Sequence, residues 1–106
     1  MTITKVTVES NTAQGGAGYT SGTAYGGGVC LGTVSVPFTV TFCNVTIENN
    51  AAKDAGAFGY PPSLGGGIYI DPTATAYLDA FTVANTIYNT ADIDPNIDGS
   101  YLPRNC

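Results

Sequence analysis

The sequence predicts an all-β fold, a parallel β-solenoid of about two and a half coils, from three observations. The composition suits strands, because the 106 residues include 15 Thr and 8 Val but only 4 Leu. Two unrelated short motifs recur at one spacing of 39 residues. Apolar and polar residues also alternate with a period of two, which places successive side chains on opposite faces of a strand.

The first motif contains asparagine and occurs three times, as Asn11-Thr12-Ala13, Asn50-Ala51-Ala52 and Asn89-Thr90-Ala91. The second is a glycine run and occurs twice, as Gly26-Gly27-Gly28-Val29 and Gly65-Gly66-Gly67-Ile68. The chain therefore divides into repeats 1–39, 40–78 and 79–106, which we expect to form one module over residues 1–106.

Each repeat is expected to contain three short strands. In the first strand Val6 falls on Val45 and Val8 on Ile47, which predicts a buried stack of apolar side chains. The second strand, residues 29–31, falls on residues 68–70 with the same alternation. The third strand is expected over residues 38–42.

The corners between strands carry glycine or asparagine. Glycine permits a positive φ and close approach of backbones, so residues 26–28 are expected to form a tight corner. Asn11, Asn50 and Asn89 are expected to stack as a ladder in which each amide binds its neighbour. In the third repeat Phe81 is matched with Phe42, and Thr86 falls where Ile47 stood, so a bulge or looser coil is expected there.

Residues 15–25 and 53–64 are predicted to be one loop in two versions, projecting from the side of the stack. Four aromatic residues on these loops could hold a carbohydrate or a protein ligand: Tyr19, Tyr25, Phe58 and Tyr60. The alternative is that they fold back and cover the side of the solenoid.

The glycine motif followed by Val or Ile, alternating with Val-Thr-Val/Ile-Glu-x-Asn-x-Ala, resembles the repeats of pectin-lyase-like right-handed parallel β-helices. The nearest resemblance is to polymorphic outer-membrane proteins and autotransporter passengers, whose Gly-Gly-Ala-Ile/Leu/Val motif matches positions 26–29 and 65–68 with Gly in place of Ala. Their Phe-x-x-Asn motif is not reproduced. The resemblance implies a right-handed helix and an adhesin-like protein in an extracellular or cell-surface setting.

Charge and composition exclude several function classes. The net charge of −5 argues against binding to nucleic acid, and no apolar run is long enough for membrane insertion. The chain has no His, so Ser–His and Cys–His catalysis is excluded. Glu9 and Glu48 could form a close pair of carboxylates, but solvated charges at equivalent repeat positions are the simpler interpretation. The prediction is therefore that the chain is not an enzyme, the alternative being part of a polysaccharide lyase or glycosidase.

Residues 94–99 give a candidate metal site. The oxygen-bearing side chains of Asp94, Asn96 and Asp98, followed by Gly99, have the spacing of the first half of a calcium loop. Asn105 stands where such a loop needs a bidentate Glu, so a polar turn is the alternative. No cofactor other than calcium is indicated.

Three cysteines and one sequon are candidates for covalent modification. Cys30 and Cys43 lie in one coil and are predicted to form the disulfide, which leaves Cys106 free or joined to another molecule. Asn44-Val45-Thr46 is a glycosylation sequon, and Asn44 is expected to point outward.

The predicted function is that of a non-catalytic structural or adhesive segment. The strand-like N-terminal edge predicts end-to-end stacking of the chain on copies of itself as a filament, or on further coils of a longer protein of which this chain is a fragment.

Overall fold

The computed structural model describes residues 1–16, 23–32, 36–54 and 62–106, and the predicted ligand-binding residues Tyr19, Phe58 and Tyr60 lie outside these ranges. In these ranges the elements follow in the order β1 (Thr2–Thr4), β2 (Thr7–Glu9), β3 (Thr12–Gln14), β4 (Val29–Leu31), β5 (Phe38–Cys43), β6 (Thr46–Glu48), β7 (Ala51–Lys53), β8 (Ile68–Ile70), β9 (Ala74–Leu78), α1 (Ala80–Ala84), β10 (Thr86–Ile87), β11 (Ile97–Asp98) and β12 (Leu102–Pro103).

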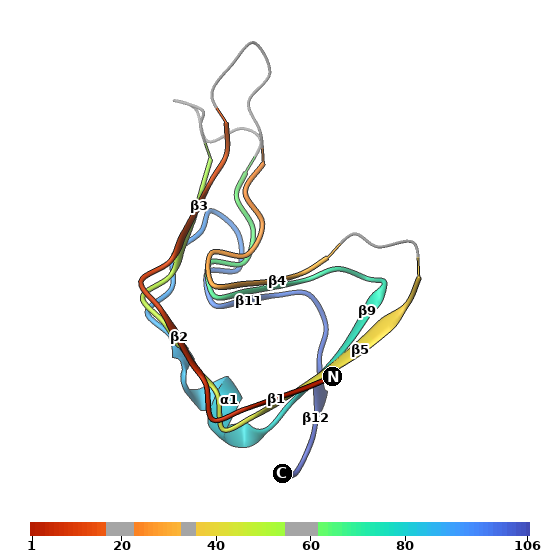
Figure 1. Ribbon diagram of the computed structural model, residues 1–106. Helices are drawn as coiled ribbons and strands as arrows, with labels where there is room; N and C mark the ends of the chain where they lie inside the picture. Colours follow the sequence, from red (N-terminus) through yellow and green to blue (C-terminus); the bar gives the residue numbers. More distant parts are fainter. Residues whose placement is uncertain (17–22, 33–35, 55–61) are drawn as a thin grey trace.

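The strands form parallel sheets between segments far apart in the sequence. The sheet orders are β1-β5-β9-β12, β10-β6-β2, β11-β8-β4 and β3-β7. Figure 1 shows the chain following one closed path three times, so that successive strands lie side by side. We call residues 1–39 the first pass, residues 40–78 the second pass and residues 79–106 the third pass. The described residues are thus mainly strand, as the composition predicted.

The first two passes pair in the predicted register of 39 residues. Thr7 pairs with Thr46 and Val8 with Ile47, and the same offset joins β3 to β7 and β4 to β8. Because side chains alternate across a strand, this register stacks apolar residues on apolar ones inside the path.

The core is deepest in the second pass. Phe42, Val45, Ile47 and Ile68 are fully buried there, and Leu78 closes the group. Val6 was predicted to share this burial, and that prediction was wrong, because 40% of Val6 is exposed and none of Val45 is. A residue of the first pass has a neighbour on one side only, since β2 lies at the edge of its sheet.

The predicted asparagine ladder is present and has four members. Asn11 Nδ2 donates to Asn50 Oδ1 at 3.1 Å, and Asn50 Nδ2 donates to Asn89 Oδ1 at the same distance. Asn89 in turn donates from Nδ2 to Asn96 Oδ1 at 3.2 Å. Asn50 is almost fully buried, so this ladder satisfies an amide that would otherwise be costly to bury.

Glycine is required at the corner beside the ladder. Gly26 and Gly65 have φ values of +67° and +63°, which only glycine adopts easily. A Cβ atom on Gly28 would lie 2.9 Å from the side-chain amide of Asn50, and one on Gly67 would lie 2.7 Å from Nδ2 of Asn89. Each pass therefore needs glycine here to make room for the asparagine of the next pass.

The third pass departs from the fixed period through α1. Leu78, not Phe81, pairs with Phe42, so β9 is offset from β5 by 36 residues. Three additional residues then precede β10, where Thr86 pairs with Ile47 at the predicted offset of 39. The match of Phe81 with Phe42 was therefore wrong. Phe81 lies in α1 and is 46% exposed.

Asp79 anchors α1 against the second pass. Its carboxylate caps the helix by accepting from the N–H and hydroxyl of Thr82, and it accepts from the N–H of Asn44. Thr82 Oγ1 in turn accepts from the N–H of Val45 at 3.1 Å. Burial alone would raise the pKa of Asp79, but these hydrogen bonds outweigh it and hold the pKa below the ordinary value.

Replacing Asp79 with Ala should lower the free energy of unfolding by about 2–3 kcal/mol, because a cap is lost and buried donors lose their acceptor. Asp79→Asn keeps one acceptor oxygen and should lose less. Urea denaturation followed by circular dichroism measures both variants. Equal losses in the two variants would contradict this account of the carboxylate.

The third pass is also shorter than the others between its third strand position and the glycine corner. Thr90 pairs with Ala51 at an offset of 39, but Ile93 pairs with Leu64 at an offset of 29. Ten residues present in the second pass are thus missing from the third, and pairing resumes without them.

The disulfide joins Cys43 to Cys106, with their Cα atoms 5.8 Å apart. The predicted pair of Cys30 and Cys43 was therefore wrong, and Cys30 is free and exposed. The cause is the course of the C-terminal residues, which return to pair β12 with β9 and so bring Cys106 near the end of β5. In the described part of the chain no helix is long and apolar enough to span a membrane.

Candidate binding surface

Aromatic and acidic side chains gather on the outer face of the β11-β8-β4 sheet. Cys30, Tyr69 and Asp98 pair in register across β4, β8 and β11, so their side chains form one row. The ring of Tyr25 lies with its centroid 4.7 Å from that of Tyr69, at an interplanar angle of 49°. We call these four residues and Asp71 the tyrosine surface.

Charges tune the tyrosine surface. Asp71 accepts from the N–H of Thr73 at 3.0 Å and from its hydroxyl at 2.7 Å, and these bonds, with one from Tyr69, lower the pKa of Asp71. Desolvation, followed by the negative charge of Asp71, raises the pKa of Tyr69. At neutral pH the surface therefore carries a neutral phenol beside a charged carboxylate, a combination that can stack on a sugar ring and bind its hydroxyl groups.

Cys30 is exposed but poorly activated. Burial of its sulfur, followed by the negative charge of Asp71, raises the pKa of the Cys30 thiol. Nucleophilic and redox chemistry needs the thiolate, so this thiol is suited to neither at neutral pH.

Of the four aromatic residues predicted to bind a ligand, the described part of the chain includes Tyr25, which belongs to the tyrosine surface. Sequence reasoning missed Tyr69 and Asp71, because Tyr69 was treated only as the outward residue of a strand. The repeat could have indicated Tyr69, since residue 30 falls on residue 69 and Tyr25 precedes the same glycine corner.

The predicted calcium ligands are divided between two tasks. Asn96 Oδ1 accepts from the N–H and from Nδ2 of Asn89, both at 3.2 Å, and so ends the asparagine ladder. The carboxyl groups of Asp94 and Asp98 share a hydrogen bond. No group of three or more acidic, Cys or His side chains suited to a metal occurs among the described residues. Calcium binding stays a prediction, and Asn96 would have to be replaced as a ligand.

The Asp94–Asp98 pair should make stability depend on pH. Burial, followed by the hydrogen bond and charge of Asp94, raises the pKa of Asp98 to about 6. A folded state that holds this proton more tightly than the unfolded state loses stability as pH rises from about 4 to 6. We expect a loss of about 1 kcal/mol after solvent screening.

The measurement is the free energy of unfolding across this pH range in the wild type and in Asp98→Asn, which cannot titrate. Only the wild type should show this loss, although the lowered pKa of Asp71 adds an opposite slope to both proteins. Parallel pH profiles for the two proteins would contradict the shift.

The candidate catalytic and glycosylation residues lie on the opposite edge of the strand path. Glu9 pairs in register with Glu48 across β2 and β6, so the two carboxylates are neighbours as predicted. Glu9 is exposed and Glu48 is half-buried. Asn44 is exposed at a corner with φ of +55°, which leaves its side chain accessible for glycosylation.

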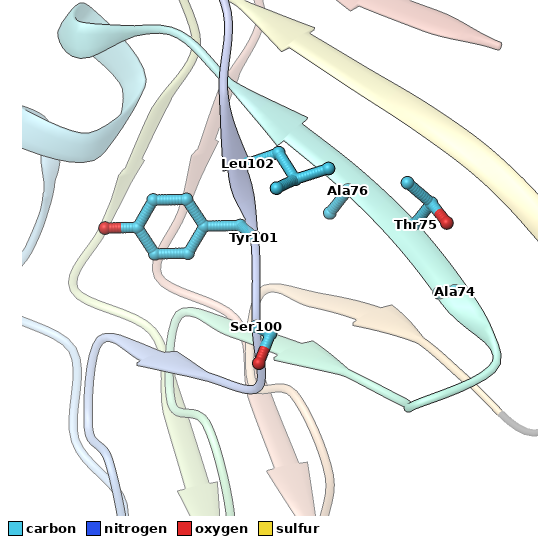
Figure 2. Close-up of a pocket in the computed structure, with 6 residues that line it drawn as sticks. All are labelled: Ala74, Thr75, Ala76, Ser100, Tyr101 and Leu102. Atoms are coloured by element: carbon cyan, nitrogen blue, oxygen red, sulfur yellow. The ribbon is translucent and has the colours of Figure 1, made fainter.

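A hollow of about 260 Å³ lies between β9 and the C-terminal segment, lined by Ala74, Thr75, Ala76, Ser100, Tyr101 and Leu102. Figure 2 shows Leu102 directed toward Ala76, while the ring of Tyr101 points away from β9. None of these lining residues is a carboxylate, Lys, Arg or Cys, so they provide no acid–base pair for catalysis.

No protein-family model, curated protein or solved structure matches the chain.

Proposed function

We propose that the chain is a segment of a right-handed parallel β-helix that serves a non-catalytic, structural or adhesive role at a cell surface or in an extracellular assembly. The observation that carries this proposal is the shared offset of 39 residues between β2 and β6, β3 and β7, and β4 and β8. A path that repeats in register buries one side chain per position in a continuous stack, as a solenoid requires.

The other features support the parts of this role. The Cys43–Cys106 disulfide is in keeping with an oxidising, extracellular environment. The tyrosine surface supplies exposed aromatic rings beside carboxylates, which suits adhesion to a carbohydrate.

Stacking of the passes is tested by cross-linking. Thr7→Cys with Thr46→Cys, made in a Cys30→Ser background, should form a second disulfide within the monomer, because these residues pair directly. Thr7→Cys with Thr86→Cys is the control and should not, because β6 separates β2 from β10. Peptide mapping after proteolysis reads both, and cross-linking of the control alone would refute the proposed stack.

Adhesion is tested by retention on immobilised polysaccharides with Tyr25→Ala/Tyr69→Ala against the wild type. We expect at least about tenfold weaker retention, since two stacking rings are lost. Tyr88→Ala removes an exposed tyrosine outside the surface and should bind normally. Equal binding by all three proteins would exclude the tyrosine surface from adhesion.

The absence of catalysis is tested separately. We expect no products from pectin-like or other acidic polysaccharides. Activity that disappears in Glu9→Gln or Glu48→Gln would overturn the proposal and favour a polysaccharide lyase or glycosidase.

A further inference from the structure

All four sheets end on the same side of the molecule. In each of them the strand of the first pass lies at an edge: β1, β2, β3 and β4. The inward apolar residues of this pass are only half-buried, as for Ile3, Val8 and Val29, whereas their partners Phe42, Ile47 and Ile68 are buried. The first pass thus has the inner face of a stacked layer without the layer that would cover it.

Hydrogen bonding defines what could cover this side. The N–H groups of Gly26, Gly27, Gly28 and Val29 donate to the carbonyls of the equivalent stretch in the second pass, residues 64–67. The carbonyls of Gly26, Gly27 and Gly28 have no such donor among the described residues. Asn11 Oδ1 likewise accepts no hydrogen bond there, although Asn50 Oδ1 accepts two from Asn11. The uncovered side therefore needs a run of backbone N–H groups and one side-chain amide.

The third pass does not offer these groups. At its corner Asp94, Pro95 and Asn96 stand at the positions of Gly65, Gly66 and Gly67, because Ile97 pairs with Ile68. Proline has no N–H, so one donor of the run is missing. Asn96 carries the Cβ atom that glycine must lack, and its Oδ1 already takes both donors of Asn89. A second copy of the chain is therefore a poor match for the uncovered side.

From this asymmetry we infer that the first pass is a docking surface for one more pass of the same repeat, joined ahead of residue 1 and carrying a Gly-Gly-Gly corner and a ladder asparagine, while the third pass ends the stack. This inference rests on the proposed stack of passes and adds its polarity. The predicted filament of identical chains would need the third pass to act as such a donor, so self-association becomes one outcome of the test.

The test adds a copy of residues 1–39 before residue 1. We expect the melting temperature to rise by about 5–10 °C, as newly buried side chains and ladder bonds add to stability. Amide hydrogens of residues 2–14 should also exchange more slowly. The matched control has Gly27→Pro and Gly28→Asn in the added copy only, which reproduces the corner of the third pass and should abolish both gains.

A second control adds residues 40–78 after Cys106 and should give no rise in melting temperature. The inference is overturned if the control copy stabilises as well as the unaltered copy, or if the extension at Cys106 stabilises equally. Filaments of the unextended chain in sedimentation experiments would also overturn it. Failure here together with successful Thr7–Thr46 cross-linking would reject the docking surface and leave the proposed stack intact.

Discussion

Val45→Asp is expected to unfold the protein under conditions in which Val6→Asp remains folded. The two valines occupy equivalent repeat positions, but Val45 is fully buried and Val6 is largely solvent-accessible. A carboxylate at position 45 would lie unpaired in the core, at a cost of about 4–5 kcal/mol, which is a large part of the stability of a domain this size. At position 6 the carboxylate stays hydrated.

Thermal and urea unfolding of both variants gives the comparison. Similar losses at the two positions would mean that both are covered, which would contradict the uncovered first pass. A small loss at position 45 would contradict the stacked core itself.

Removing the Cys43–Cys106 disulfide should cost about 4 kcal/mol, because the bond closes a loop with a sequence separation of 63 residues. The double variant Cys43→Ala/Cys106→Ala is compared with Cys30→Ala, which removes an exposed free thiol and should leave stability nearly unchanged. Urea denaturation without reductant measures the difference. Mass spectrometry that finds Cys30 linked to Cys43 would contradict this pairing.

The parts of the fold that could be predicted from the sequence are those in which one period governs both sequence and space. Val8 on Ile47 and Asn11 on Asn50 follow directly from the 39-residue spacing. Phe81 was misplaced because two local changes compensate. Three residues are lost between β8 and β9 and three are gained in α1, so the total period is unchanged while Leu78 takes the core position.

The disulfide and the binding surface were harder to predict for a different reason. Cys106 reaches Cys43 because the chain after Gly99 leaves the repeat path, and nothing in a periodic pattern encodes that departure. The tyrosine surface joins a strand residue, Tyr69, to a residue before the glycine corner, Tyr25, whose positions differ by 44 rather than by the repeat. Contacts that depart from the period have to be seen in the structure.

The ten-residue difference between the second and third passes has a practical consequence. Pairing at Thr90 with Ala51 and at Ile93 with Leu64 is kept although the connecting segment varies in length. The length of this connection is therefore not fixed by the core, in keeping with the small entropic cost of lengthening a loop. The same connection is a natural place to graft foreign peptides, so that a series of stacked passes could display several inserts at the spacing of neighbouring strands, about 4.8 Å.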